Sequence, residues 1–209
     1  GKVQSLLSHS YLMPRQQYGT TVYFKTQAVM FMLQDVLGKD LFRKAMREYC
    51  SRWKFRHPLP HDFFHTIEDV AGRDLDWFWH EWFEETYLLD MAVRGVSNEE
   101  HEGMWRASIE LENLEQAIMP ATLRLYLQDG STKDVRFSES AWMYRNRYTH
   151  IVEGLHSKVR RVELDPDLLL LDINRMNNTS GLPNIQFDYG MNLLNVVLYP
   201  IDAYRVNVA

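Results

Sequence analysis

Two patterns of hydrophobic residues divide the chain, and the change from one to the other falls near Leu89. Before Leu89, apolar residues recur three or four positions apart, which is the spacing of amphipathic helices. After it, apolar and polar residues alternate, as they do in half-buried β-strands. The chain is therefore predicted to be α+β, with an N-terminal α-helical subdomain at 1–90 and an antiparallel β-sandwich at 91–178. Residues 179–209 are predicted to form an extended tail or the start of a further module.

The helical part is organised around the stretch at 20–38, TTVYFKTQAVMFMLQDVLG, which is predicted to be one helix. The hydroxyl of Thr20 or Thr21 can cap its start, and Gly38 stands where a left-handed residue commonly ends a helix. This arrangement places Tyr23 in the first turn of the helix. Three more helices are predicted to start near aspartates: from Asp40 to 53, from Asp62 to 72, and from about Asp74 onward.

The N-terminal stretch at 1–19 is expected to be an irregular approach to this helix, with Pro14 and Gly19 as breakers. The chain begins with Gly1 and Lys2 and has no initiating methionine. We therefore expect it to be a piece of a longer protein.

Short strands separated by turn residues make up the second part of the chain. The predicted strands lie at 104–113, 121–128, 133–137, 148–152, 158–164 and 169–173. Asp129 and Gly130 are predicted to form a hairpin turn. Asp165, Asp167 and Asp172 carry oxygen atoms of the kind that calcium prefers. They lack the glycine and the terminal glutamate of an EF-hand loop, so turn and capping roles are favoured.

The C-terminal part carries weaker signals. The polar run at 177–181, NNTSG, is expected to be a linker. Strand-like pieces follow at 196–198 and 204–206. Two alternatives are open for these pieces. They pair with the edge of the sandwich, or they belong to a module that continues further along the chain.

A family resemblance rests on the run at 18–25, YGTTVYFK, which contains a Y-x-K segment formed by Tyr23 and Lys25. Aromatic, acidic and glycine positions then follow in a fixed order: Phe42, Tyr49, Trp53-Lys54-Phe55, Asp62-Phe63, Ile67-Glu68, Gly72, Leu75, Trp77-Phe78-Trp79 and Trp82-Phe83. Over about the first ninety residues, this order resembles the aminopeptidase N family of gluzincin zinc metallopeptidases, in the part that follows the family's zinc site. One position departs from the family pattern, because the glycine after the lysine is Thr26 here.

The resemblance implies roles for two tyrosines. The Y-x-K tyrosine of the family donates a hydrogen bond to the oxyanion of the tetrahedral intermediate, and Tyr23 is the matching, catalytic position. Tyr18 is expected to bind substrate as part of the cleft wall. From the hydrophobic pattern alone, a packed core residue whose hydroxyl is hydrogen-bonded is the favoured interpretation of Tyr23.

The resemblance further implies a zinc cofactor and a peptide substrate for the parent protein, an aminopeptidase-type hydrolase. The sequence contains no HExxH motif, so the zinc ligands are expected to lie outside this chain. The isolated chain is therefore predicted to hold no metal, to be inactive and to act with the upstream catalytic portion of the same protein. The alternative is a non-catalytic scaffold, derived from that family, that binds another protein.

The motif His61-Asp62-Phe63-Phe64-His65 spaces two histidines as a helical zinc site would. Pro60 precedes it, so His61 is expected to lie before the helix, with Asp62 as the N-cap. An aspartate is also one methylene shorter than the general-base glutamate of HExxH. A helix start is thus favoured over a metal site.

Composition excludes several other classes of protein. Apolar residues make up 45% of the 209 residues, enough for a sizeable core, and the net charge of −5 argues against nucleic-acid binding. No apolar run approaches the ~20 residues of a membrane span. The single cysteine, Cys50, cannot form an internal disulfide and is expected to be buried beside Met46 and Trp53. It does not distinguish a cytoplasmic from an exported protein.

Overall fold

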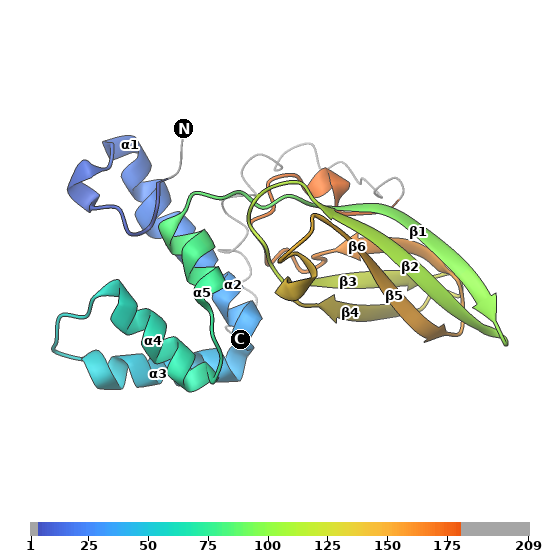
Figure 1. Cartoon of the computed structure of the whole chain (residues 1–209), viewed down its shortest axis with the longest axis horizontal. Helices are drawn as coiled ribbons and strands as arrows, with labels where there is room; N and C mark the ends of the chain where they lie inside the picture. Colours follow the sequence, from blue (N-terminus) through green and yellow to red (C-terminus); the bar gives the residue numbers. More distant parts are fainter. Residues whose placement is uncertain (1–3, 181–209) are drawn as a thin grey trace, which may run out of the picture. The chain divides into compact units, whose positions relative to one another are not determined.

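A computed structural model describes residues 4–180 (Figure 1). The described residues divide between a compact helical unit that ends at Tyr87 and a compact β unit that begins at Leu88. Helices come first and two antiparallel sheets follow, which confirms the predicted α+β class. Within the described part of the chain, no helix has the length and apolar character needed to cross a membrane.

The first long helical run begins earlier than predicted. It consists of α1 (Arg15–Tyr18), the π-helical segment η2 (Gly19–Lys25) and α2 (Thr26–Leu37). The expected break at Gly19 is wrong, because its backbone is helical, with φ −59° and ψ −45°. Pro14 takes the N-cap position, where the fixed φ of proline suits the entry to a helix. Neither Thr20 nor Thr21 is therefore a cap, and Tyr23 lies well inside the run.

The remaining helices are α3 (Lys39–Trp53), α4 (Pro60–Ala71) and α5 (Asp76–Trp79), followed by a second π-helical segment, η3 (His80–Glu84). Gly38 and Gly72 end α2 and α4 with φ of 81° and 67°, a region that favours glycine. Asp40 is not the N-cap of α3. Gly38 holds that position, because it is the single residue between the end of α2 and the start of α3.

Aromatic side chains hold the helical unit together. Phe64 of α4 stacks on Trp79 of α5, with ring centroids 4.5 Å apart and planes at 9°. The predicted burial of Cys50 is wrong, because its side chain is exposed. Ala45 is the buried residue of α3, and a residue five positions further is turned about 140° around a helix.

The β unit contains two three-stranded antiparallel sheets, in the orders β1-β2-β5 and β4-β3-β6. Their strands are β1 (Met91–His101), β2 (Met104–Asn113), β3 (Ala121–Leu127), β4 (Thr132–Phe137), β5 (Arg147–Leu155) and β6 (Val159–Leu164). The two sheets pack together over a core whose fully buried members include Ile109, Leu123, Leu125 and Val162. The predicted sandwich is confirmed, and five of its strands match predicted ones.

Two strand predictions differ from the structure. Strand β1 was not predicted, because its C-terminal half is polar. A register shift between Val93 and Gly95 also interrupts the alternation of apolar and polar residues. The strand predicted at 169–173 is wrong, since only Asp172 forms an isolated bridge, to Leu89. The amides of Leu169 and Leu170 instead donate to the carboxylate of Asp165, at 2.9 and 3.0 Å.

The aspartates of this region have the predicted turn and capping roles. The Asp172 carboxylate accepts from the amides of Met91 and Asn174. The polar run that starts at Asn177 is not a linker over its described residues. Thr179 bridges Glu163, and the Ser180 amide donates to the carbonyl of Val162 at 3.0 Å. The strand-like pieces predicted at 196–198 and 204–206 lie outside the described residues.

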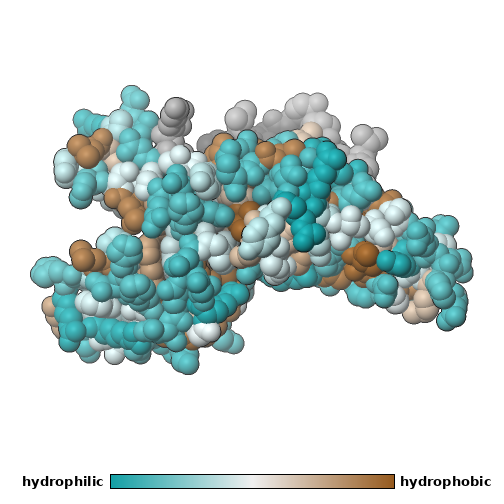
Figure 2. Space-filling model, viewed as in Figure 1, coloured by the Kyte–Doolittle hydropathy of each residue, from teal (hydrophilic) through white to brown (hydrophobic). Residues whose placement is uncertain are grey.

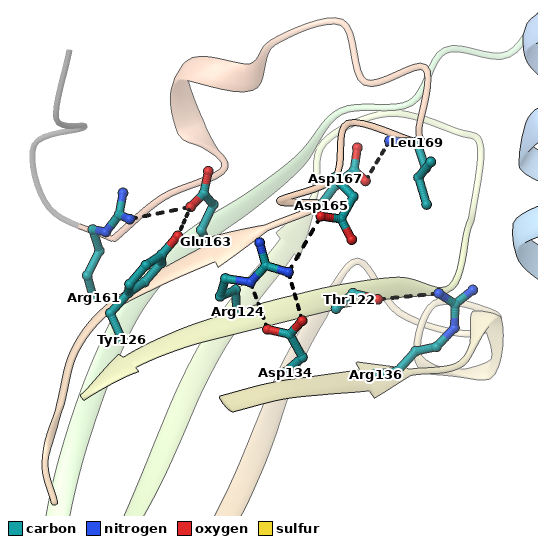
Figure 3. Close-up of polar contacts among 10 residues, drawn as sticks. All are labelled: Thr122, Arg124, Tyr126, Asp134, Arg136, Arg161, Glu163, Asp165, Asp167 and Leu169. Atoms are coloured by element: carbon teal, nitrogen blue, oxygen red, sulfur yellow. Dashed lines mark hydrogen bonds and ion pairs between the residues drawn. The ribbon is translucent and has the colours of Figure 1, made fainter. Parts of the chain in front are cut away.

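The outer face of the β4-β3-β6 sheet carries paired charges (Figure 3). Arg124 binds both carboxylate oxygens of Asp134, at 2.9 and 2.8 Å. The Tyr126 hydroxyl donates to Glu163 at 2.7 Å, and the Arg161 guanidinium lies 3.9 Å from the Tyr126 ring centroid. The charges of Arg124 and Arg161 are thus each paired with a carboxylate on a neighbouring residue of this face.

Candidate functional site

Tyr23 lies in η2 with its side chain 63% exposed. Among the residues that the structure describes, its hydroxyl has no hydrogen-bond partner, and its ring contacts the ring of Tyr18. The alternative of a packed core residue with a bonded hydroxyl is therefore wrong. An exposed phenol can still donate its proton to a ligand.

The π-helical geometry of η2 explains how Tyr18 and Tyr23 meet. Residues five apart point in different directions on an α-helix, whereas the i→i+5 bonding of a π-helix brings them toward one side. The Thr26 hydroxyl donates to the Thr21 carbonyl, five residues earlier, at 3.4 Å. Tyr18 and Tyr23 are likewise five apart, and their ring centroids lie 6.0 Å from each other. The structure thus brings the two predicted site residues together.

Lys25 is the last residue of η2 and the other member of the Y-x-K segment. Its ammonium nitrogen, Nζ, donates to the backbone carbonyl of Glu85 at 3.3 Å. Partial burial lowers the pKa of Lys25 to about 8, because desolvation disfavours the charged form. No pattern in the sequence predicted this contact of Lys25; its place in the Y-x-K segment was the one available signal.

Thr21 lies on the opposite, buried side of η2. Among the described residues its hydroxyl has no hydrogen-bond partner, which is unusual for a fully buried oxygen. One side of η2 therefore faces the interior through Thr21, while another presents Tyr18 and Tyr23 outward.

The structure corrects the position of His61, which is the second residue of α4 and does not precede the helix. His61 and His65 share a face of α4, with ring centroids 6.2 Å apart. Asp62 is the third helical residue, and its carboxylate accepts from the Leu59 amide at 2.7 Å. Asp62 thus has the predicted capping role. It is not the N-cap residue itself, because it caps the helix from inside the first turn.

One cluster of acidic groups occurs in the described part of the helical unit, formed by Glu68, Asp74 and Asp76. The Glu68 carboxylate accepts from the amide of Leu75 at 3.0 Å and from Trp79 Nε1 at 2.9 Å. Glu68 therefore joins α4 to α5. The described residues show no histidine-rich group of three that could hold zinc, so the residues present in this part of the chain do not fit a zinc centre.

The exposed apolar residues of the helical unit do not merge into one surface in the view of Figure 2. They appear as separate spots on a mostly hydrophilic face. Tyr11, Leu12, Phe55 and Leu59 are among the exposed large side chains of this unit. Scattered exposed apolar residues are ordinary and identify no further site.

Comparison with known proteins relates most of the helical unit to a peptidase family. Residues 7–82 match the model of the peptidase family M1 domain. We call these matched residues the M1 segment. Tyr18, Tyr23 and Lys25 all lie inside this M1 segment. The predicted resemblance to the aminopeptidase N family is confirmed over these residues.

Parts of the chain also resemble individual aminopeptidases. The chain is 31% identical to aminopeptidase N of Escherichia coli K12 over 85 residues, which are 41% of this chain and 10% of that protein. It is 27% identical to aminopeptidase N of Lactococcus lactis over 64 residues, which are 31% of this chain and 8% of that protein. A putative aminopeptidase-2 of Caenorhabditis elegans is 35% identical over 57 residues, 26% of this chain and 3% of that protein.

A solved structure extends the likeness beyond the M1 segment. Aminopeptidase A of Legionella pneumophila, in complex with aspartic acid, superposes with a TM-score of 0.54 at 15% identity. The match covers 78% of this chain and 21% of that structure, and at this identity it shows a likeness of fold alone. The chain thus spans at most about a fifth of the length of these relatives.

Proposed function

We propose that this chain is the part of an M1 metallopeptidase that follows its zinc site, joined to the β-sandwich after it. The longer protein, which we call the parent peptidase, hydrolyses peptide bonds. The observation that carries the proposal is the exposed Tyr23, whose hydroxyl has no partner among the described residues, inside the M1 segment.

The proposed task of Tyr23 is to stabilise the tetrahedral intermediate of peptide hydrolysis. When a carbonyl carbon is attacked, its oxygen gains negative charge and becomes a stronger hydrogen-bond acceptor. A phenol placed beside that oxygen stabilises the transition state more than the bound substrate, which is the requirement for catalysis. The Tyr23 hydroxyl is suited to this because no hydrogen bond within residues 4–180 competes for its proton.

The proposed task of Tyr18 is to bind the substrate beside Tyr23. Its side chain is 37% exposed and its ring meets that of Tyr23 edge-on. An aromatic wall at this place would offer a peptide side chain apolar area and would limit the rotation of the Tyr23 ring.

The zinc on which the M1 family depends requires residues that this chain does not contain. The sequence has no HExxH motif, and the His61 and His65 pair has no third ligand among the described residues. We propose that the parent peptidase supplies the zinc site from another segment, and that the isolated chain is inactive.

The sequence of the parent protein tests this proposal. An HExxH motif upstream of this chain, with a glutamate about eighteen residues beyond it, is expected from the family resemblance. The purified parent should then contain one zinc per chain and hydrolyse aminoacyl or peptide substrates, while residues 1–209 alone should do neither. A parent with that motif lost, and without hydrolysis, would contradict the proposal and support the non-catalytic protein-binding scaffold.

A further inference from the structure

The end of the second π-helical segment leaves backbone carbonyls that the helix cannot satisfy. The last carbonyls of any helix lack partners within that helix, and other groups must donate to them. Near the end of η3, the Phe83 carbonyl accepts from the Ser5 hydroxyl at 2.7 Å and from the Leu7 amide at 3.3 Å. The Glu85 carbonyl accepts from Lys25 Nζ. Lys25 therefore caps the C-terminal end of η3 from a helix sixty residues earlier in the chain.

A cation suits this position. Helix C-termini carry partial negative charge, which attracts a lysine ammonium placed near them. Burial works in the opposite direction and lowers the pKa of Lys25 to about 8. At neutral pH the ammonium is still the main form, so the contact with Glu85 is a charge-assisted hydrogen bond.

Tyr23 itself has few contacts that could fix its position. It is exposed, and its contact with Tyr18 joins two side chains of the same helical run. The place of its hydroxyl in the helical unit is therefore set by the backbone of η2. The π-helical form is rare and is commonly found at functional sites, so its retention needs support from neighbouring elements.

We propose that Lys25 is a positioning residue for Tyr23. By binding the Glu85 carbonyl, it ties the π-helical turn that carries Tyr23 to the end of η3. The proposal rests on the proposed function of Tyr23 for its catalytic consequence, whereas the tie itself exists in the chain alone. The two parts can be tested separately.

The tie is tested on residues 1–209 by amide hydrogen exchange. Lys25→Met removes the donor and keeps the apolar stem, Lys25→Arg keeps a donor, and Lys44→Met on the exposed face of α3 is the matched control. The amides of η2 are expected to exchange roughly 10-fold faster in Lys25→Met alone. Unchanged exchange, or equal acceleration in α3 and α4, would overturn the tie.

The catalytic consequence is tested in the parent peptidase by a double-mutant cycle. Lys25→Met should lower kcat by up to about 10²-fold, with KM nearly unchanged, and Lys25→Arg should restore most of the rate. In a Tyr23→Phe background, Lys25→Met should cause no further loss, because it acts through the Tyr23 hydroxyl. An equal loss in both backgrounds would overturn the positioning role. A normal kcat in Tyr23→Phe alone would overturn the proposed function and leave the exchange result on the tie intact.

Discussion

The ring of Tyr18 meets the ring of Tyr23 edge-on, with centroids 6.0 Å apart and planes at 75°. Such edge-to-face contacts contribute about 0.5–1.5 kcal/mol beyond their buried area. In the proposed site this contact restricts the Tyr23 ring and forms part of the substrate cleft. Both effects depend on the Tyr18 ring and not on its hydroxyl.

Replacing Tyr18 separates these contributions in the parent peptidase. Tyr18→Leu should raise KM by about 2- to 10-fold, the loss expected for one aromatic contact. Tyr18→Phe keeps the ring and is the matched control, with KM near the wild-type value. Steady-state kinetics of both variants provides the measurement. A Tyr18→Phe enzyme as impaired as Tyr18→Leu would contradict a role for the ring alone.

Asp62 should contribute to stability as a helix cap. Asp62→Ala removes the acceptor for the Leu59 amide and should lower the free energy of unfolding by about 1 kcal/mol. Asp62→Asn should cost much less, because an amide oxygen can accept the same bond. Urea unfolding of residues 1–209 compares the two variants. Turnover of the parent peptidase that disappears in Asp62→Asn, at an unchanged unfolding temperature, would show that Asp62 is a catalytic base.

Lys25 should make the helical unit more stable at alkaline pH. Its pKa is about 8 in the folded chain, below the value of 10.5 of a free lysine. Between these values the unfolded state binds more protons, so stability rises as the pH increases from about 8 to 10.5. Below about pH 8, Lys25 is protonated in both the folded and the unfolded state. The folded state then carries the full free-energy cost of burying the ammonium charge.

Thermal unfolding of residues 1–209 as a function of pH measures this effect. Lys25→Met should remove the Lys25 contribution, and Lys44→Met should leave it in place. If the Lys25→Met variant still shows the full rise in stability with pH, another group titrates in this range.

Asp165 should be a strong stabiliser of the β unit. Its buried carboxylate accepts from the amides of Leu169 and Leu170 and pairs with Arg175 at 2.8 Å. Asp165→Ala leaves these donors without an acceptor. It should lower the free energy of unfolding by about 3–5 kcal/mol, as when one partner of a buried ion pair is removed. The exposed Asp167 pairs with Arg124 at 3.5 Å, so Asp167→Ala should cost at most about 1 kcal/mol. Comparable losses in the two variants, measured by urea unfolding, would contradict the role assigned to Asp165.

The sequence predicted best where structure depends on neighbours in the chain. Strand β2 has the predicted bounds, Met104–Asn113, because alternation over ten residues is a local signal. The start of the first helix was misplaced because Gly19 adopts helical angles, although glycine is unfavourable inside a helix. Cys50 was predicted to be buried because the apolar pattern did not show which residue lies at the centre of the buried face of α3. That residue is Ala45, and Cys50 is exposed.

The residues of the proposed site came from the family resemblance, which predicted roles for both Tyr23 and Tyr18, but their contacts could not be predicted. The π-helical turn that brings their rings together has no signature in the hydrophobic pattern. The bond from Lys25 to the Glu85 carbonyl joins residues sixty positions apart, and its acceptor is a backbone atom whose partner depends on where η3 ends.

The catalytic role of Tyr23 is the central claim, and Tyr23→Phe in the parent peptidase tests it most directly. Loss of one hydrogen-bond donor to a developing oxyanion typically lowers turnover by ~10²–10³-fold. We expect kcat to fall by about that factor, with a modest change in KM and an unchanged unfolding temperature, because the exposed Tyr23 hydroxyl has no partner to lose among the described residues. Near-normal turnover in that variant would contradict the account.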